Sequence, residues 1–258
     1  MGKVIIVTGG SRGIGKAIIQ DILNRPKEKD TLVISVARNE PPLKELQGIY
    51  DSDRFQYVVG DVVNEKVQAR ILELALKRND HIHAIVANAG VLAPVDSIKN
   101  FNFKDWKQHF DINFFSIVSL VSKCLPHMSG NDLLPGNIIM VSSGASVKAY
   151  KGWSCYCASK AALNSFALSI ATEMEGQVKA IAVAPGVVAT QMQVDIREKF
   201  GPEGMPADVF KRFTDLYDQN KLLEAHVPGH VYAELAVNGI PASLNGLYLR
   251  FNDERLSH

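Results

Sequence analysis

The sequence predicts an α/β fold in which one parallel β-sheet of about seven strands has helices on both faces. Seven short runs rich in β-branched residues recur along the chain, and segments with helical periodicity lie between them. Most of these runs are apolar throughout, which is typical of parallel strands that are buried on both faces. The regular alternation of strand and helix indicates right-handed βαβ units in a doubly wound sheet.

The expected elements follow one another in this order through nearly the whole chain. The strands are predicted at Val4–Thr8, Leu32–Ala37, Phe55–Val59, Ile82–Ala87, Asn137–Ser142, Val178–Ala184 and Leu247–Arg250. The helices are predicted at Gly13–Asn24, Asn64–Asn79, Phe103–Ser129, Trp153–Glu175 and His230–Asn238.

Residues 190–226 depart from this alternation. They are more polar than the rest and contain Gly201-Pro202 before an amphipathic piece at Val209–Tyr217. Long excursions of this kind are usually lids or mobile loops. A chain of 28.3 kDa can bury a core large enough to be stable without disulfides or a structural metal. We therefore expect one domain over residues 1–258, with a lid-like excursion at about residues 190–226.

The composition excludes several classes of protein. With 47% hydrophobic and 21% charged residues, the chain is neither disordered nor collagen-like nor a disulfide scaffold. A net charge of +1 gives no reason to expect a nucleic-acid partner. Cys124, Cys155 and Cys157 are an odd count, so we expect free thiols in the reducing cytoplasm. The apolar runs predict no export signal and no membrane span, and the scattered histidines predict no metal site.

A glycine-rich loop follows the first predicted strand directly. Thr8-Gly9-Gly10-Ser11-Arg12-Gly13-Ile14-Gly15 leads into an apolar-periodic helix. Its glycines permit a tight turn and bring backbone amides close to a pyrophosphate, which the helix N-terminus also attracts. Strand, loop and helix in this order predict a Rossmann-type dinucleotide site rather than a plain turn. The expected contacts in this loop are Gly9, Ser11, Arg12, Ile14 and Gly15.

The end of the second predicted strand indicates which dinucleotide is bound. An acid there accepts a hydrogen bond from the ribose 2′-hydroxyl, whereas an arginine accommodates a 2′-phosphate. This chain ends the strand with Ala37-Arg38, and Arg12 adds a second cation in the loop. We therefore expect NADPH rather than NADH, with an ordinary solvated charge as the other explanation of Arg38.

Three later strand ends face the same crevice. Asp61 can accept a hydrogen bond from an adenine amino group, and Asn88 and Gly90 lie where the backbone approaches the adenosine ribose. The turn after the sixth strand can hold the nicotinamide carboxamide through Pro185, Gly186, Val188 and Thr190. Each of these segments, taken singly, is also compatible with an ordinary loop.

The residues suited to carbonyl chemistry come from three separate segments. Tyr156 and Lys160 lie four apart, so they share one helix face and are about 6 Å apart along its axis. A nearby cation lowers the pKa of a tyrosine, and such a phenol can give a proton to an alkoxide as hydride reaches carbon. Ser143 ends a strand and can hold the same carbonyl oxygen. Asn113 is polar in an apolar run and needs a partner, which a water relay to Lys160 would supply.

In this order and spacing, the motifs resemble the single-domain short-chain dehydrogenase/reductase family over the whole chain. The resemblance rests on the glycine loop, Asn88-Ala89-Gly90, Asn113, Ser143, Tyr156-x-x-x-Lys160 and Pro185-Gly186. It implies that Tyr156 is the general acid and base and that Lys160 tunes its pKa and binds the ribose. It also implies that Ser143 binds the carbonyl and that Asn113 organises the proton relay.

Residues 151–157 resemble the sepiapterin reductase branch of this family, including its diketone-reducing relatives of the benzil reductase type. The resemblance implies a small-molecule carbonyl substrate walled by Trp153 and Tyr150, although Trp153 is equally compatible with a packing role. Sepiapterin reductases anchor the pterin with an acid near the C-terminal strand, where this chain has Arg250. We therefore expect an NADPH-dependent reductase of aromatic 1,2-diketones, such as benzil to benzoin. A pterin ketone reductase, an NAD-dependent alcohol dehydrogenase and a catalytically silent dinucleotide-sensing protein are the alternatives.

The composition of the predicted helix around Tyr156 also gives an expectation for the oligomeric state. From Ala158 to Ala171 it is apolar nearly all round, which favours a face covered by a second copy in a homodimer. Deep burial within a monomer is the competing explanation.

Overall fold

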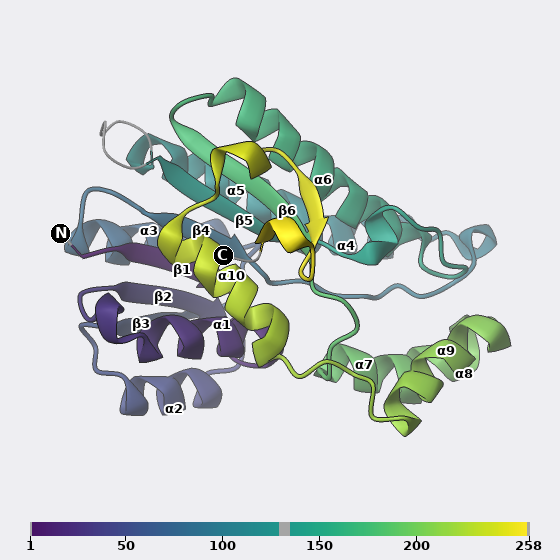
Figure 1. Ribbon diagram of the computed structural model, residues 1–258. Helices are drawn as coiled ribbons and strands as arrows, with labels where there is room; N and C mark the ends of the chain where they lie inside the picture. Colours follow the sequence, from purple (N-terminus) through teal and green to yellow (C-terminus); the bar gives the residue numbers. More distant parts are fainter. Residues whose placement is uncertain (1, 129–134, 257–258) are drawn as a thin grey trace.

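The computed structural model describes residues 2–128 and 135–256 and contains a seven-stranded parallel sheet with helices on both faces (Figure 1). The strand order is β3-β2-β1-β4-β5-β6-β7, and each neighbouring pair is parallel. The predicted α/β fold class is therefore confirmed. The strands are β1 Val4–Thr8, β2 Leu32–Ala37, β3 Phe55–Val59, β4 Ala84–Ala87, β5 Gly136–Val141, β6 Val178–Ala184 and β7 Tyr248–Arg250.

The helices form the two outer layers of the main body and a separate lobe. They are α1 Gly13–Asn24, α2 Pro41–Ile49, α3 Glu65–Arg78, α4 Phe103–Phe110, α5 Ser116–Cys124, α6 Ser154–Glu173, α7 Gln191–Asp195, α8 Gly201–Gly204, α9 Ala207–Asp218 and α10 His226–Asn238. Successive strand side chains point to opposite faces of a sheet, so each strand supplies two cores. In β1, Ile5 and Val7 pack with α1, α2 and α10, whereas Val4 and Ile6 pack with α3, α5 and α6.

Several predicted bounds agree with the structure, and others differ for local reasons. The bounds of β1, β2, β3, β6 and α1 are as predicted, whereas β4 begins two residues late and β5 is displaced by one residue. The prediction missed α2, which begins with Pro41-Pro42 and is held by buried Leu43 and Leu46. Proline is well tolerated in the first turn of a helix because the amide there lacks an intrahelical partner anyway. Helix α10 likewise has a proline, Pro228, in its first turn, and it begins at His226, four residues before the predicted start.

The single helix predicted at Phe103–Ser129 is interrupted. A π-helical turn at Asp111–Phe115 separates α4 from α5, and the amide of Ser116 donates to the carbonyl of Asp111, five residues earlier. Such turns add one residue to a helix and often occur at functional sites. The fully buried Asn113 lies inside this turn. A short 3₁₀ turn follows α5, and Ser129, the predicted end, lies outside the described residues.

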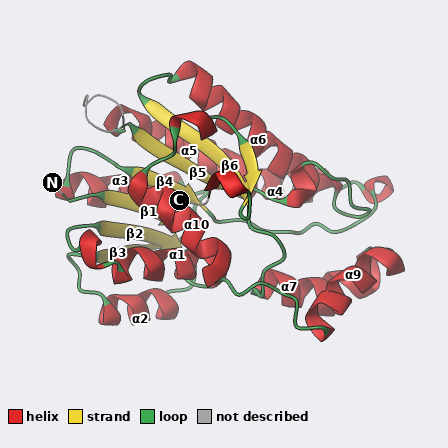
Figure 2. Cartoon of the chain, in the orientation of Figure 1, coloured by secondary structure: helices red, strands yellow, loops and turns green. Residues whose placement is uncertain are grey.

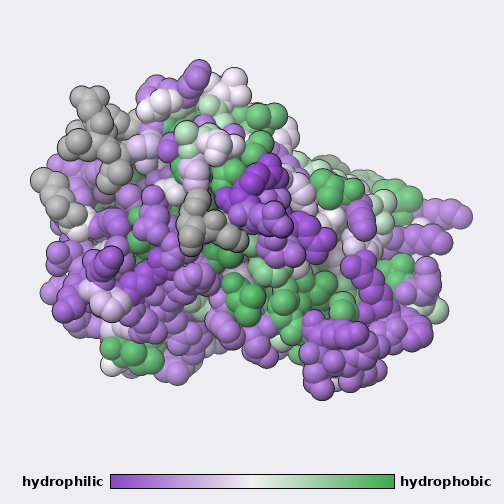
Figure 3. Space-filling view, in the orientation of Figure 1, coloured by the Kyte–Doolittle hydropathy of each residue, from purple (hydrophilic) through white to green (hydrophobic). Residues whose placement is uncertain are grey.

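The predicted excursion is helical and forms a lobe beside the main body. Helices α7, α8 and α9 lie beyond the carboxyl ends of the strands, at the lower right of Figure 1 and in red in Figure 2. The amphipathic piece predicted at Val209–Tyr217 lies within α9. In Figure 3, apolar side chains gather between the start of α10 and this lobe.

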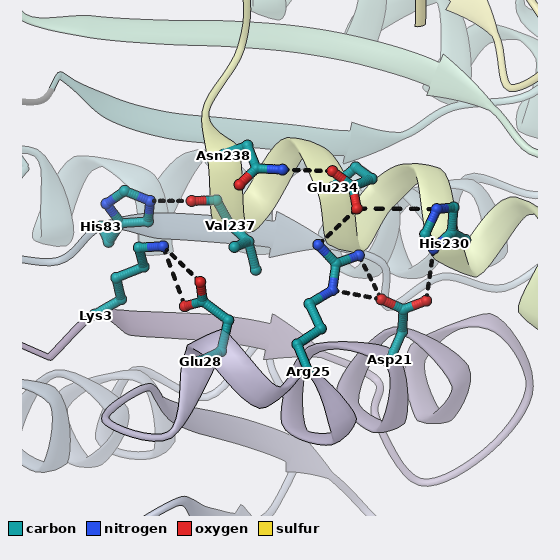
Figure 4. Close-up of polar contacts among 9 residues, drawn as sticks. All are labelled: Lys3, Asp21, Arg25, Glu28, His83, His230, Glu234, Val237 and Asn238. Atoms are coloured by element: carbon teal, nitrogen blue, oxygen red, sulfur yellow. Dashed lines mark hydrogen bonds and ion pairs between the residues drawn. The ribbon is translucent and has the colours of Figure 1, made fainter. Parts of the chain in front are cut away.

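A charged network joins α1 to α10 (Figure 4). Arg25 Nη1 lies 2.7 Å from Glu234 Oε1, and His230 Nδ1 lies 2.8 Å from Asp21 Oδ2. Asn238 donates to the same glutamate. Because α1 begins directly after the glycine loop, the network holds that loop's helix against the rest of the body.

Within residues 2–128 and 135–256, no helix is both long enough and apolar enough to cross a membrane. In the same ranges, no group of three or more His, Cys, Asp and Glu side chains is arranged to hold a metal ion. Cys124, Cys155 and Cys157 are free thiols.

Candidate active site

The predicted site residues lie on loops that leave the carboxyl ends of six strands, in the π turn and on α6. In doubly wound sheets, ligands bind at the carboxyl ends of the strands, at the point where the strand order reverses. Here the reversal lies between β1 and β4. The glycine loop follows β1, Asn88 follows β4, Ser143 follows β5 and Pro185 follows β6. The fold therefore brings together segments that are far apart in the sequence.

The glycine loop has the backbone that a pyrophosphate cradle requires. Gly9 has φ +74° and Gly13 has φ +54°, a region that side chains disfavour. A Cβ atom on Gly15 would lie 2.3 Å from the Gly9 carbonyl oxygen. Among the described residues, no side chain caps the first turn of α1, so its amides are open to an anion. Ser11 is half-buried, Arg12 is exposed, and Ile14 packs against the core. These residues fit a dinucleotide.

Asn88 shapes the glycine loop itself. Its Nδ2 donates to the carbonyl oxygens of Thr8 at 2.8 Å and Gly9 at 3.1 Å. The amides of Asn88 and Ala89 both donate to Thr8 Oγ1 at 3.0 Å. The Asn88 side chain therefore ties the end of β4 to the glycine loop.

The two arginines expected near a 2′-phosphate are both exposed. Neither Arg12 nor Arg38 has a hydrogen bond or an ion pair from its guanidinium to the described part of the chain. The nearest following acid, Glu40, accepts a hydrogen bond from Tyr57 at 3.3 Å. Asp61 is half-buried and accepts from the amide of Val63 at 3.2 Å, close to the adjoining ends of β2 and β3.

The turn after β6 lies against the glycine loop. A Cβ atom on Gly13 would lie 3.2 Å from Thr190 Cγ2, and Thr190 donates to the carbonyl of Val188 at 3.4 Å. Gly186 has φ +80°. A cavity of about 570 Å³ opens beside this turn, and its wall includes Gly186, Val187, Arg212, Leu223, Arg250 and Phe251. A smaller cavity along the edge strand β3 contains none of the predicted site residues.

Tyr156 and Lys160 lie on α6 and are only 7% and 4% exposed. Lys160 Nζ lies 5.7 Å from the centroid of the Tyr156 ring and donates to the carbonyl of Val141 at 2.8 Å. A Cβ atom on Gly90 would lie 3.5 Å from Lys160 Nζ and 3.4 Å from Asn113 Oδ1. The lysine and the asparagine therefore converge beside Gly90.

The pKa of Tyr156 is shifted in the direction opposite to the sequence prediction. Burial raises the pKa of Tyr156 to about 12, and a hydrogen bond with Ser143 lowers it by a smaller amount. Burial also lowers the pKa of Lys160 to about 8. The prediction was wrong because it considered only the neighbouring charge, whereas removal of both groups from water disfavours the tyrosinate and the ammonium alike. Tyr156 is consequently protonated at neutral pH.

The side-chain amide of Asn113 has direct partners in the protein. Its Oδ1 accepts from the amide of Val91 at 2.8 Å, and its Nδ2 donates to the carbonyl of Val91 at 2.8 Å. The side-chain amide therefore finds protein partners on the loop after β4, and the water relay to Lys160 stays a prediction. Ser143 Oγ accepts from the amide of Ala145 at 3.1 Å and remains half-buried.

Aromatic side chains surround the phenol. Trp153 is 5% exposed and lies 5.8 Å from Tyr156 between ring centroids, at 87°. Tyr150 packs on the indole at 5.2 Å, and Phe213 of the lobe stacks on it at 5.3 Å and 19°. Trp153 Nε1 is buried and has no hydrogen-bond partner among the described residues. Arg212 Nη1 donates to the Tyr150 hydroxyl at 3.1 Å.

Sequence reasoning missed two residues of this site. Phe213 lies in the amphipathic piece that the sequence identified, whose apolar face was the available signal. His109 is buried beside Asn113, four residues earlier on the same helical segment, and that spacing was the signal. The sequence alone assigns neither residue to the site, because Phe213 reaches it through the position of the lobe and His109 through the π turn.

Comparison with known proteins agrees with this geometry. Residues 3–201 match the family model for short chain dehydrogenases. The chain is 49% identical to benzil reductase ((S)-benzoin forming) IRC24 of Saccharomyces cerevisiae, covering 99% of this chain and 98% of the relative. It is 33% identical to benzil reductase ((S)-benzoin forming) of Bacillus cereus, covering 86% and 88%. The crystal structure of the short chain dehydrogenase/reductase YIR035C from Saccharomyces cerevisiae is 50% identical and superposes with a TM-score of 0.94, covering 99% and 98%.

Proposed function

Because the chain belongs to the short-chain dehydrogenase family, we propose that it is an NADPH-dependent carbonyl reductase that acts on aromatic 1,2-diketones. The observation that supports this most is the buried phenol of Tyr156, which has a hydrogen bond with Ser143 and lies near Lys160, whose ammonium is beside Gly90 in the loop after β4. A phenol whose pKa is raised to about 12 keeps its proton at neutral pH. It is therefore in the protonated form that ketone reduction requires, whereas oxidation of an alcohol requires a deprotonated base.

Each residue has a defined part in this proposal. The chemistry that a bound reduced nicotinamide would supply is a hydride for the carbonyl carbon. The glycine loop would hold its pyrophosphate, and Lys160 would bind its ribose. Ser143 donates a hydrogen bond to the carbonyl oxygen, and Tyr156 Oη transfers its proton to the same oxygen as the C–O bond becomes single. The product is an alcohol, and the phenol is restored by a proton from solvent.

The aromatic cluster supports a flat aromatic substrate with a second oxygen. Trp153 packs against Tyr150 and Phe213 and has a buried indole N–H without a partner among the described residues. A buried donor of this kind is costly unless a ligand accepts its hydrogen bond. The second carbonyl of a 1,2-diketone is such an acceptor, and two relatives of this chain are named benzil reductases. A pterin ketone is less suited, because Arg250 stands where an acid would bind the amino group.

Replacing Trp153 tests the diketone directly. Trp153→Phe keeps an aromatic wall and deletes the N–H, so kcat/KM for benzil should fall about 10-fold more than kcat/KM for deoxybenzoin, which lacks only the second oxygen. Steady-state rates with NADPH measure both. Trp106→Phe, in the other tryptophan, is the matched control because that ring packs on Phe101 outside the cluster. Equal losses on the two ketones would reject the diketone subsite.

Cofactor preference follows from the two free guanidinium groups. The double variant Ala37→Asp/Arg38→Ala should shift preference from NADPH toward NADH by about 10- to 150-fold, because a charge-assisted contact contributes about 1.5 to 3 kcal/mol. Titration calorimetry with both cofactors measures the shift. Native protein that already binds NADH as tightly as NADPH would contradict the assignment.

Lys44→Ala is the matched control for the cofactor variants, since it removes a charge from α2 and leaves Arg12 and Arg38 in place. The alternative of a catalytically silent dinucleotide-sensing protein predicts NADPH binding without turnover of any ketone. The presence of Ser143, Tyr156 and Lys160 together argues against it.

We further propose a cytoplasmic homodimer in which residues 1–258 act as one domain and the lobe acts as a lid. Phe213 of α9 packs on Trp153, which supports the lid. Large apolar side chains on the outer faces of α4, the π turn and α6 support the dimer, since Phe103, Phe115 and Leu168 are 71%, 53% and 58% exposed. Sedimentation equilibrium should give twice the chain mass, and a monomer at micromolar concentration would contradict this.

A further inference from the structure

His109 is a buried titratable residue that the proposed reaction does not use. It is 1% exposed. Its Nδ1 lies 2.6 Å from the carbonyl oxygen of Ala93. Its Nε2 lies 2.8 Å from Ser159 Oγ and 2.9 Å from Asn113 Nδ2. Three segments of the chain therefore meet on one imidazole: the loop after β4, the π turn and α6.

The partners determine which nitrogen carries the proton. Burial lowers the pKa of His109 to about 4, so the ring is neutral at physiological pH. A carbonyl can only accept, so the proton is on Nδ1, and Nε2 is the acceptor. Asn113 Nδ2 has two hydrogens; one goes to the carbonyl of Val91, and the other faces His109 Nε2. The imidazole thus satisfies the last free hydrogen of the Asn113 amide.

The same ring touches the reacting turn of α6. Ser159 lies between Tyr156 and Lys160 in sequence, and its hydroxyl contacts both His109 Nε2 and the carbonyl of Tyr156, the latter at 2.9 Å. The His109 ring packs edge-on against the Tyr156 ring, with 6.1 Å between centroids and an angle of 80°. Movement of the imidazole would therefore displace the phenol and the asparagine together.

We propose that His109 is a positioning residue for ketone reduction: as a neutral Nδ1–H imidazole it holds the Asn113 amide and the Tyr156–Lys160 turn against the loop after β4. The inference rests on the proposed function for its kinetic consequence. Its structural part, the tautomer and the contacts of the ring, does not depend on which ketone is reduced.

Two substitutions separate positioning from general packing. His109→Gln retains an amide that can donate to Ala93 and accept from Asn113, whereas His109→Leu fills the space and retains neither function. The leucine variant should lower kcat about 30-fold with NADPH saturating, while the KM for the ketone changes less than about 3-fold, and the glutamine variant should recover most of the loss. The substrate is whichever ketone the native protein turns over fastest among benzil, sepiapterin and simple aryl ketones.

His83→Leu is the matched control. His83 is also buried, at 4% exposure, and its Nε2 lies 3.1 Å from the carbonyl oxygen of Val237 in α10. Helix α10 covers the face of the sheet opposite to the face covered by α6, which carries Tyr156. It should lower the melting temperature by a similar amount to His109→Leu and leave kcat within about 2-fold, as a packing defect remote from the reacting groups does.

Nitrogen-15 spectra of the ring provide a readout that needs no turnover. The expected signals for His109 at pH 7 are a protonated Nδ1 and an unprotonated Nε2. An Nε2–H tautomer, a protonated ring, a leucine variant with native kcat, or a glutamine variant no better than leucine would each overturn the inference. Absence of ketone turnover by the native protein would instead reject the proposed function, and the spectra would still decide the tautomer.

Discussion

Tyr156→Phe is expected to lower kcat for ketone reduction by about 10²- to 10⁴-fold while NADPH still binds, because the variant keeps the ring and deletes the proton donor. The phenol is 7% exposed and its pKa is raised to about 12, so no solvent molecule can easily replace it as the acid. Steady-state turnover and NADPH fluorescence titration measure the two quantities separately.

Tyr50→Phe is the control for loss of a buried tyrosine hydroxyl. Tyr50 donates to Asn24 at 2.8 Å, far along the chain from the reacting residues, and it should retain native turnover. Native kcat in Tyr156→Phe on every ketone tested would reject the assignment of the acid.

Lys160→Met is expected to lower kcat/KM by about 10³-fold, because in the proposed mechanism one ammonium supports both the phenol and the cofactor ribose. Its effect depends on pH in a defined direction. Burial lowers the pKa of Lys160 to about 8, so the positive charge is present below that pH and is lost above it. Native kcat/KM should therefore fall as pH rises through about 8.

In the methionine variant this alkaline limb should move to higher pH, toward the titration of the phenol itself. Profiles of kcat/KM between about pH 6 and pH 10 test this, since that range spans the lowered and the unperturbed lysine values. Lys179→Met is the control, because Lys179 Nζ also donates to a backbone carbonyl, that of Ile240, at 2.8 Å. An alkaline limb that stays in place in Lys160→Met would exclude the lysine as its source.

Local rules account for the elements that the sequence predicted well. The runs that form β1, β2, β3 and β6 are apolar or β-branched and end at turn residues, so their bounds can be derived from neighbours in the chain. The π turn at Asp111–Phe115 cannot be derived in this way. It depends on the contact of Asn113 with Val91, which lies 22 residues earlier in the loop after β4.

The same division holds in the site. The sequence pattern predicted which residues belong to the glycine loop. Gly9 and Gly13 have positive φ, and Gly15 leaves no room for a Cβ atom, so the local backbone conformation itself requires glycine. It did not predict the tyrosine pKa, because desolvation depends on every group that encloses the phenol. The sequence predicted that Trp153 lies near Tyr156. The stacking of Phe213 on Trp153 could not be predicted, because it depends on where the lobe packs.

By itself, the sequence determined the fold class, the order of the strands and helices, the glycine loop and the family. These depend on backbone conformation and on hydrophobic periodicity, which each segment carries locally. Only the tertiary structure supplied the burial that raises the pKa of Tyr156, the contacts from which the tautomer of His109 is inferred, and the indole N–H of Trp153 that lacks a partner among the described residues. Proton affinity and hydrogen-bond satisfaction are set by burial and by groups from distant segments, so they exist only after those segments have packed together.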